Sequence, residues 1–463
     1  MLIRFSCKNF RSIGENPITL DMVSSTKTRK LSSHVCSSSD SPKILRNAVI
    51  YGANASGKSN LIKAMKFFKD SVVAGRVSSL KTNEYCRTGN GLADKESVFD
   101  IQISIDGKSY DYGFGCILKT MQITSEWLYE LGNPSKLIFE RNVGNNIKIG
   151  EALEKNSIDK DINRLKIYIE DFENSFQNDR SVLFLTFLNQ GRSFSKDSNL
   201  SVFSSVHGWF VRKINIVDSM HAMGAEFYSE DSTLDQVSNI FASFDTGITK
   251  LVKKMLSIDE LNKMLPSLLI DDIKEELDNA SKDKNCIKSV IIVRNQDTFI
   301  GIERQGVEDP VVTTLSIKHE GSLLDFEFAD ESDGTKRIFD FLDMFFSKSK
   351  DTVFVVDELN RSLHPMLTKY MVELFNKMHK DDDCQLIFTT HENDIMSLDL
   401  FLREEIWFIE RDTAGCSKLF SLNKFDTIRA DTRLSRQYLK GRYGGIPILP
   451  TVFDESSLCK EED

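Results

Sequence analysis

The sequence predicts an α/β protein whose core is interrupted by a mostly helical insertion. Three observations predict this class. Strand-like and helical patterns alternate near both ends of the chain, a glycine-containing loop joins a strand to a helix at residues 48–68, and a second apolar strand ends in the acidic pair Asp357-Glu358. Such alternation is typical of a parallel sheet covered by helices, while the middle of the chain carries helical periodicity.

Length and composition narrow the class of protein. The chain has 463 residues, of which 40% are hydrophobic and 28% charged, as expected for a globular protein with two or three compact parts. The formal net charge of −10 does not indicate general coating of nucleic acid. There is no C-x-x-C pair, no signal-peptide pattern and no apolar run approaching the roughly 18 residues of a membrane span. We therefore expect a cytoplasmic protein with reduced thiols and no membrane partner.

The first part of the chain predicts strands, one helix and a hairpin. The opening residues alternate like strands and end in the apolar run 48–51, and apolar residues three and four apart follow at 61–68. Residues 97–114 alternate on both sides of Asp106-Gly107. Because Asp-Gly accepts the positive φ angles of a tight turn, this pattern favours a β-hairpin.

In the rest of the chain the spacing of hydrophobic residues changes twice. Residues 146–287 are mostly helical and polar without sustained heptads, which disfavours a long coiled coil. Further on we expect strands at 289–293 and 298–302, a helix at 335–346, a strand at 352–356, a helix at about 365–379 and a strand at 385–389. The sequence thus predicts three domains, 1–145, 146–287 and 288–463.

A phosphate-binding loop is the strongest motif. Residues 52–59, Gly-Ala-Asn-Ala-Ser-Gly-Lys-Ser, match G-x-x-x-x-G-K-[ST]. Its glycines let backbone N–H groups face phosphate oxygens, Lys58 is expected to reach the β- and γ-phosphates, and Ser59 to place its hydroxyl on Mg²⁺. Chance produces such a match in roughly one chain in fifty of this length, but the strand–loop–helix context argues against chance. The candidate nucleotide-binding residues here are Gly52, Asn54, Ala55, Ser56, Gly57, Lys58, Ser59 and Asn60.

Two later strands end in polar residues. Asp357 follows the apolar run 352–356, so it can hold Mg²⁺ through water at the edge of a sheet, and Glu358 can polarise an attacking water. The alternative is an ordinary strand with a solvated acidic end. His391 follows the strand at 385–389 and could contact a γ-phosphate, although a lone histidine is more often structural.

A second anion site is indicated just before the helix at 335–346. Ser332 and Gly334 stand where a helix N-terminus exposes its N–H groups. Simple helix capping explains the same residues, because Ser, Asp and Gly are all good cap residues. The two interpretations are compatible.

Together these motifs resemble the ATP-binding-cassette (ABC) ATPases of the SMC, RecF and OLD type. Residues 8–12, Lys-Asn-Phe-Arg-Ser, resemble that group's first strand and the turn that contacts the base, which implies nucleotide contacts for Arg11 and Ser12. The other correspondences are residues 52–59 with Walker A, Ser332 and Gly334 with the signature, Asp357 and Glu358 with Walker B, residues 359–365 with the D-loop and His391 with the switch histidine.

The resemblance implies an ABC-type P-loop core, made of a mixed sheet and an antiparallel β subdomain, that binds ATP and Mg²⁺ and hydrolyses ATP slowly. Domains 1–145 and 288–463 would form its two halves and 146–287 the insertion. Glu358, Lys58 and His391 would be catalytic, and Ser59 and Asp357 would hold the metal. One Walker A and one signature per chain imply at least a head-to-tail homodimer.

Some features depart from that class. The signature is Glu-Ser-Asp-Gly-Thr, and two glutamines, Gln102 and Gln122, are candidates for the Q-loop. Only 72 residues follow His391, too few for the C-terminal Toprim nuclease of full OLD proteins. Any nuclease is therefore expected on a separate chain.

Within the class, the chain most resembles compact ATPases of phage-defence operons, in particular the ATPase subunit of PARIS-type anti-phage systems. The shared features are the signature, Ser362-Leu-His-Pro365 and the closing Tyr443–Pro447. The resemblance implies a larger homo-oligomer that holds a Toprim-like toxin nuclease as a separate subunit and releases it when a phage protein is sensed.

Two other functions are weighed against this one. A RecF- or SMC-like ATPase that binds DNA directly in repair or maintenance is the alternative, and the acidic net charge and short insertion favour the defence role over it. A P-loop kinase is disfavoured because kinases lack the late Asp-Glu pair, the signature and the switch histidine.

A short helix is expected near the end of the sequence. Asp431 could cap it and Gly441 lies near its end, with Arg433, Arg436 or Gln437, and Lys440 on one side. That side is either a solvated face or a contact for an acidic partner or nucleic acid.

Overall fold

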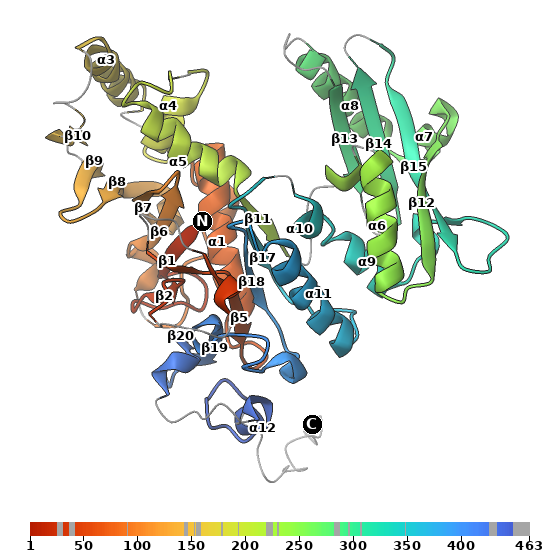
Figure 1. The fold of residues 1–463 in the computed structure, drawn as a ribbon. Coiled ribbons are helices and arrows are strands. Elements are labelled where there is room, and N and C mark those ends of the chain that lie inside the picture. The colour runs from red at the N-terminus through yellow and green to blue at the C-terminus, as the bar shows by residue number, and fades with distance from the viewer. Residues whose placement is uncertain are drawn as a thin grey trace, which may run out of the picture. The chain divides into compact units, whose positions relative to one another are not determined.

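The structure is a computed structural model in which the chain forms two compact units (Figure 1). The first unit comprises Met1–Ile214, Asp351–Leu359 and Asp383–Asp463, and the second comprises Asn215–Lys350 and Asn360–Asp382. The structure describes residues 1–25, 31–36, 42–89, 91–142, 147–151, 153, 159–176, 179–192, 194–218, 226–228, 231–281, 288–294, 297–305, 308–347, 349–425 and 433–447.

The first unit contains a seven-stranded antiparallel sheet with the order β10-β9-β8-β7-β6-β1-β2. Its strands are β1 (Leu2–Lys8), β2 (Ile18–Asp21), β6 (Ser97–Ile105), β7 (Lys108–Ile117), β8 (Gln122–Leu131), β9 (Lys136–Asn142) and β10 (Lys148–Ile149). The predicted hairpin is confirmed, since Asp106 and Gly107 join β6 to β7 with φ angles of 48° and 81°.

A mixed sheet also lies in this unit. Its strands are β5 (Asn47–Tyr51), β17 (Val353–Val356), β18 (Gln385–Thr389), β19 (Ile406–Arg411) and β20 (Ser417–Ser421), with β11 (Ile214–Val217), at which the first unit ends, as the outer strand. Strands β17, β18, β5 and β19 run parallel in that order, and β20 is antiparallel to β19. The four parallel strands therefore end at one edge of the sheet.

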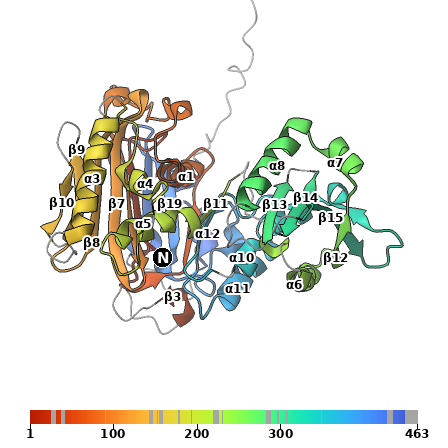
Figure 2. The same cartoon turned by 90° about the horizontal axis from the view of Figure 1, so that it is seen from above.

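Helix α1 (Lys58–Ala74) packs on the antiparallel sheet. The Phe67 and Phe99 ring centroids are 4.7 Å apart, and Phe68 stacks on Tyr112 at 5.9 Å. Helices α4 and α5 lie beside α1 (Figure 2). The other elements of this unit are β3 (Val35–Cys36), β4 (Ile44–Leu45), α3 (Asp159–Ser175), α4 (Phe184–Asn189), α5 (Ser201–Arg212) and α12 (Leu434–Leu439). The short helix expected near Gly441 is α12, while its expected cap Asp431 lies outside the described residues.

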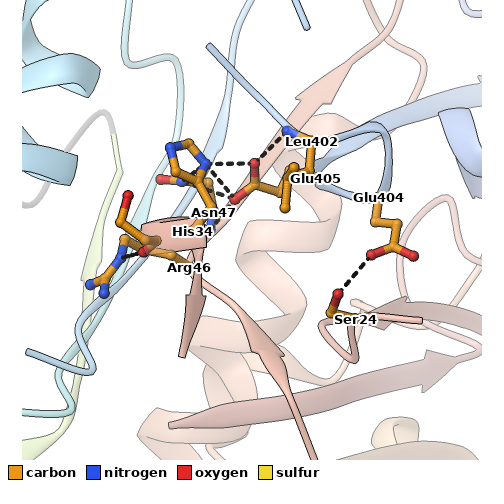
Figure 3. Close-up of polar contacts among 8 residues, drawn as sticks. Ser24, His34, Arg46, Asn47, Leu402, Glu404 and Glu405 are labelled. Atoms are coloured by element: carbon orange, nitrogen blue, oxygen red, sulfur yellow. Dashed lines mark hydrogen bonds and ion pairs between the residues drawn. The ribbon is translucent and has the colours of Figure 1, made fainter. Parts of the chain in front are cut away.

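A buried polar cluster anchors the start of β5 (Figure 3). The Glu405 carboxylate accepts hydrogen bonds from the backbone N–H groups of Asn47 and Leu402, at 3.1 and 2.7 Å. It also accepts one from the Asn47 amide at 3.0 Å and contacts His34 Nδ1 at 2.8 Å. Because Gly52 follows the other end of β5, this cluster fixes the strand from the end opposite the phosphate loop.

The second unit is built around a sheet with the order β12-β15-β14-β13, to which β16 is added through β15. Its strands are β12 (Ile248–Met255), β13 (Lys288–Arg294), β14 (Phe299–Gln305), β15 (Val311–His319) and β16 (Phe326–Glu327). Its helices are α6 (Asp231–Ser243), α7 (Ile258–Met264), α8 (Ser267–Ser281), α9 (Asp333–Phe339), α10 (Asp343–Phe346) and α11 (Pro365–Met378). Leu261 of α7 and Ile273 of α8 share a buried apolar cluster with Ile302 of the sheet.

The compact units divide the chain at other places than the predicted boundaries near 145 and 287. Residues 147–214 belong to the first unit, and β12 pairs with β15 about sixty residues later in the second. The expected helix at 335–346 is also interrupted, between α9 and α10. Periodicity identifies a local helix or strand, but the sheet that a strand joins depends on partners far away in the sequence.

Candidate functional site

The phosphate loop lies between β5 and α1, as the sequence predicts. All of β5 is buried, and the loop that follows contains Ala55 and Gly57 with φ angles of 62° and 116°. A Cβ atom on Gly52 would lie 2.5 Å from the carbonyl oxygen of Ile409, and one on Gly57 would overlap the Ser417 hydroxyl. Glycine is therefore required at both positions, since any side chain would push the loop away from the sheet.

Lys58, the first residue of α1, folds over this loop. Its Nζ donates to the carbonyl oxygens of Gly52 and Ala53, at 2.8 and 3.0 Å. Burial lowers the pKa of Lys58 from 10.5 to about 8, against the opposing effect of the Glu358 and Asp357 carboxylates. An ammonium that has lost much of its water shell gains strongly from a nearby phosphate.

The acidic pair follows β17 at the same edge of the sheet. The Thr389 hydroxyl, at the end of the adjacent β18, donates to Asp357 Oδ1 at 2.6 Å and accepts from the Glu358 N–H at 2.8 Å. Glu358 has a φ of 52°, a conformation that non-glycine residues rarely adopt and that is common at functional sites. Thr389 thus fixes both acids, and it is a residue that the motif comparison did not single out.

His391 lies close to the same charges. Burial lowers its pKa, Lys58 lowers it further, and Glu358 and Asp357 oppose the shift. Its imidazole is therefore neutral at neutral pH. These electrostatic effects indicate that four side chains lie near one another: Lys58, Asp357, Glu358 and His391. They stand at the carboxyl ends of β5, β17 and β18, where open α/β sheets bind their ligands.

Ser12 also reaches the loop, through a chain of hydrogen bonds. Asn60 Nδ2 donates to Ser12 Oγ at 2.8 Å, Ser12 Oγ lies 2.7 Å from Ser417 Oγ, and the Ser417 hydroxyl donates to the Ser56 carbonyl at 2.7 Å. Ser417 was not predicted, because a serine at the start of a strand carries no motif. Its role depends on β20 being brought beside the loop by the fold.

The remaining predicted residues are more scattered. Arg11, in the turn after β1, forms an ion pair with Glu84, with Nη2 2.8 Å from Oε1. Asn54 and Ala55 are exposed at the loop tip, and Ser59 lies in the first turn of α1. Gln102 donates to Asp111 on β7, and Gln122 is exposed at the start of β8, so the Q-loop candidates gain no support.

The predicted signature residues belong to the second unit. Ser332 is the N-cap of α9, and its Oγ accepts from the Thr335 N–H at 3.1 Å. A Cβ atom on Gly334 would lie 2.9 Å from the Ser362 carbonyl, so a larger residue would not fit there. The capping interpretation of Ser332 is therefore confirmed, and its action on a phosphate stays a prediction.

A cavity of about 730 Å³ opens beside the phosphate loop within the first unit. Gly52, Asn54, Ser56 and His391 line one part of it, and residues of α12 and the segment after it line another. The Ser56 hydroxyl is buried and finds no hydrogen-bond partner among the residues that the structure describes. A buried donor without a partner, next to a loop with exposed N–H groups, fits the binding of an oxygen-rich group such as phosphate.

The fold and this edge of the sheet define an α/β P-loop nucleotide-binding protein, with a mixed sheet and a separate antiparallel sheet, so the predicted fold class is confirmed. Residues 48–397, more than half of the chain, match the family described as "AAA domain, putative AbiEii toxin, Type IV TA system". The chain belongs to this AAA-domain family. No curated protein matches the sequence.

Several solved structures are similar over most of their length. An SMC head bound to the C-terminal winged-helix domain of ScpA is 13% identical, covering 91% of this chain and 97% of that chain with a TM-score of 0.43. The SMC head domain from Thermotoga maritima is 13% identical, covering 91% and 98% with a TM-score of 0.34. The Smc head domain with an extended coiled coil, bound to the C-terminal domain of ScpA derived from Pyrococcus furiosus, is 14% identical, covering 91% and 97% with a TM-score of 0.36.

The part of the chain that the structure describes contains no helix with the length and apolar character of a membrane span.

Proposed function

We propose that the chain is an ABC-type ATPase that binds ATP with Mg²⁺ and hydrolyses it slowly. The observation that carries this proposal is the convergence of Lys58, Asp357, Glu358 and His391 beside the phosphate loop. This combination supplies a cation for the phosphates, a carboxylate for a metal, a carboxylate for water and an imidazole for the terminal phosphate.

The loop residues are suited to a triphosphate. The backbone N–H groups of residues 52–59 form the cradle, and the 17-residue α1 directs its positive end at the same point. Lys58 Nζ, now bound to two loop carbonyls, would exchange these for β- and γ-phosphate oxygens. The Ser59 hydroxyl and the Asp357 carboxylate would hold Mg²⁺, which neutralises phosphate charge when bound.

Glu358 is the proposed general base. Its backbone is fixed by Thr389, and its carboxylate is close enough to Lys58 to raise the pKa of that ammonium. A carboxylate held at this edge can take a proton from water as the water attacks the γ-phosphate. The neutral His391 can hydrogen-bond to the γ-phosphate and so report whether it is present.

The site is proposed to be shared between two copies of the chain. Each chain has one phosphate loop, in the first unit, and one signature, Ser332 and Gly334, in the second. In the ABC class a signature completes the ATP site of the opposite subunit, so ATP would join two copies head to tail, and larger homo-oligomers could form from such pairs. ATP would then act mainly as a conformational switch.

Substituting Glu358→Gln tests the catalytic part of this proposal. The amide cannot accept the proton of the attacking water, so we expect hydrolysis to fall at least about a hundredfold while ATP stays bound. Phosphate release and retained radiolabelled ATP measure the two effects. A Glu358→Gln chain that hydrolyses ATP at the wild-type rate would show that another group is the base.

For the biological role, we propose a sensor and scaffold in an anti-phage defence system of the PARIS type, controlling a separate Toprim-like toxin nuclease and responding to a phage trigger protein. The family description, which names a toxin and a type IV toxin–antitoxin system, supports a role in a multi-component system of this kind. The motifs from Glu331 to Thr335 and from Tyr443 to Pro447 support the same role by resemblance.

Co-purification separates this role from direct action on DNA. Tagged Glu358→Gln chain is expressed together with the products of its neighbouring genes, and bound material is identified by mass spectrometry and by absorbance. A nuclease-like protein in stoichiometric amount supports the defence role. DNA bound without a protein partner, and lost as salt is raised, would instead support the RecF- or SMC-like alternative.

A further inference from the structure

The last described segment of the chain, Arg433–Pro447, lies against the phosphate loop. Within the first unit, Tyr438, Leu439 and Gly445–Pro447 line the same cavity as the loop residues and His391. If the cavity takes the terminal phosphates, then this segment forms one wall of the nucleotide site. Neither the motif analysis nor the family match, which ends at residue 397, assigns it a role in nucleotide binding.

A hydrogen-bond relay ties the segment to β19. The Tyr438 hydroxyl donates to the Gly445 carbonyl at 2.8 Å, and the Gly445 N–H donates to Glu410 Oε2 at 3.2 Å. Gly444 and Gly445 have φ angles of 69° and 67°, so two consecutive residues adopt the left-handed conformation that favours glycine. The turn is therefore closed across its base by Tyr438 and held to the sheet by Glu410.

Gly445 also lies close to the first residue of the loop. A Cβ atom built on Gly445 would lie 3.6 Å from Gly52 Cα and 3.6 Å from the Ile409 carbonyl oxygen, so a single methyl group would bring Gly445 into contact with Gly52. The Tyr438 ring lies 5.9 Å from the ring of Tyr51, the residue before Gly52. The relay itself ends at Glu410, but it fixes the Tyr438 ring and Gly445 beside Tyr51 and Gly52. Gly52 is the residue whose carbonyl accepts from Lys58 Nζ.

We propose that Tyr438 and Gly445 are positioning residues of the nucleotide site, which hold Gly52 and hence the phosphate loop in the conformation that binds the terminal phosphates. The physical reason is preorganisation: a loop that is already fixed loses less conformational freedom when a ligand binds. The coupling is reciprocal, so bound ATP would in turn stabilise the segment. This inference rests on the proposed ATP binding.

Two tyrosines of the segment provide a matched pair of variants. Tyr438→Phe removes the hydroxyl that bonds to Gly445. Tyr443→Phe removes a hydroxyl that is buried but has no hydrogen-bond partner among the described residues. Both rings pack on Phe408, at 5.5 and 5.6 Å, so the aromatic contact is kept in each variant.

The experiment measures the affinity of each full-length variant for a fluorescent ATP analogue with Mg²⁺, together with the melting temperature without nucleotide. We expect Tyr438→Phe to bind roughly fivefold more weakly, the typical effect of one hydrogen bond, and Tyr443→Phe to bind like the wild type. In steady-state hydrolysis Tyr438→Phe should raise KM and leave kcat unchanged.

Other results overturn the inference. A Tyr438→Phe chain that melts earlier but binds the analogue with wild-type affinity would show a purely structural role, as would equal losses of affinity in both variants. Failure of the wild-type chain itself to bind the analogue would contradict the proposed function and this inference together, whereas failure of the variant difference alone contradicts only the inference.

Discussion

At the scale of single residues, the account depends on a buried lysine among carboxylates. Lys58 is buried, and its ammonium donates to the carbonyl oxygens of Gly52 and Ala53 in the loop. Burial lowers its pKa to about 8, so a modest rise in pH removes its charge. Since a neutral amine attracts phosphate much less than an ammonium, nucleotide affinity should follow this titration.

The affinity for Mg·ATP is therefore expected to fall as pH rises through 8. Only the charged form binds well, so the apparent affinity decreases by about eightfold between pH 7.5 and pH 9, where ATP itself no longer titrates. Isothermal titration calorimetry in buffers of different ionisation enthalpy should also detect proton uptake on binding near pH 8.

A Lys58→Arg chain is the control for this titration, because its guanidinium stays charged throughout the range. An affinity that is constant from pH 7.5 to pH 9 in the wild type would contradict a Lys58 ammonium that both titrates near pH 8 and contributes to binding.

The site residues that could be predicted from the sequence are those that belong to short, continuous motifs. Residues 52–59 and the pair Asp357-Glu358 were found because a phosphate loop and an acidic strand end are local patterns. Ser417, Thr389 and Gly445 were missed. Each is a common residue type that reaches the site only because segments distant in the sequence meet at one edge of the sheet. Ser417 hydrogen-bonds to the loop, Thr389 to Asp357, and Gly445 lies beside Gly52.

At the scale of elements, strand β5 is held at both ends. Its carboxyl end carries the phosphate loop, and its amino end is fixed by the buried Glu405 carboxylate through Asn47 (Figure 3). Glu405 is fully buried and also holds the Leu402 N–H and His34. Removing such a group leaves several buried donors without an acceptor.

Glu405→Ala is accordingly expected to cost about 3 kcal/mol of unfolding free energy, because it breaks a buried polar cluster. Urea unfolding followed by tryptophan fluorescence measures this. ATP affinity under conditions where the variant is folded should be unchanged, since the cluster lies at the end of β5 remote from Gly52.

The neighbouring Glu404→Ala is the comparison, because the Glu404 carboxylate accepts from Ser24 and Ser25 in part-buried hydrogen bonds and lies outside the fully buried cluster. It should destabilise the chain less. Equal losses for both variants would show that the Glu405 cluster has no special part in holding β5.

The same scale shows which elements could be predicted. The strand–loop–helix at residues 47–74 and the hairpin at 97–117 were predicted because each is complete within a short stretch of sequence. Strand β12 was not distinguished within the helical segment, because only Ile248 and Leu251 of its eight residues are buried and its partner β15 begins at Val311. Its lysine-rich sequence shows little of the alternation between apolar and polar residues that identifies a strand.

At the scale of the whole molecule, the two halves of the proposed ATP site lie in different compact units. The phosphate loop, the acidic pair and His391 belong to the first unit, and Ser332 and Gly334 belong to the second. The central claim is that a working site combines the first unit of one copy with the second unit of another.

Mixing two inactive variants tests this claim most directly. Lys58→Ala removes the cation of the phosphate loop. Ser332→Asp keeps a good N-cap for α9, and so preserves the bond to the Thr335 N–H, but places a carboxylate where a γ-phosphate would approach. Each variant alone should be unable to hydrolyse ATP.

If the site is shared, a mixed dimer contains one intact site, formed by the loop of the Ser332→Asp chain and the signature of the Lys58→Ala chain. With random pairing in an equimolar mixture, we expect about a quarter of the wild-type hydrolysis rate to return. A mixture that remains as inactive as its components, under conditions where the wild-type chain hydrolyses ATP, would contradict a site shared between two copies.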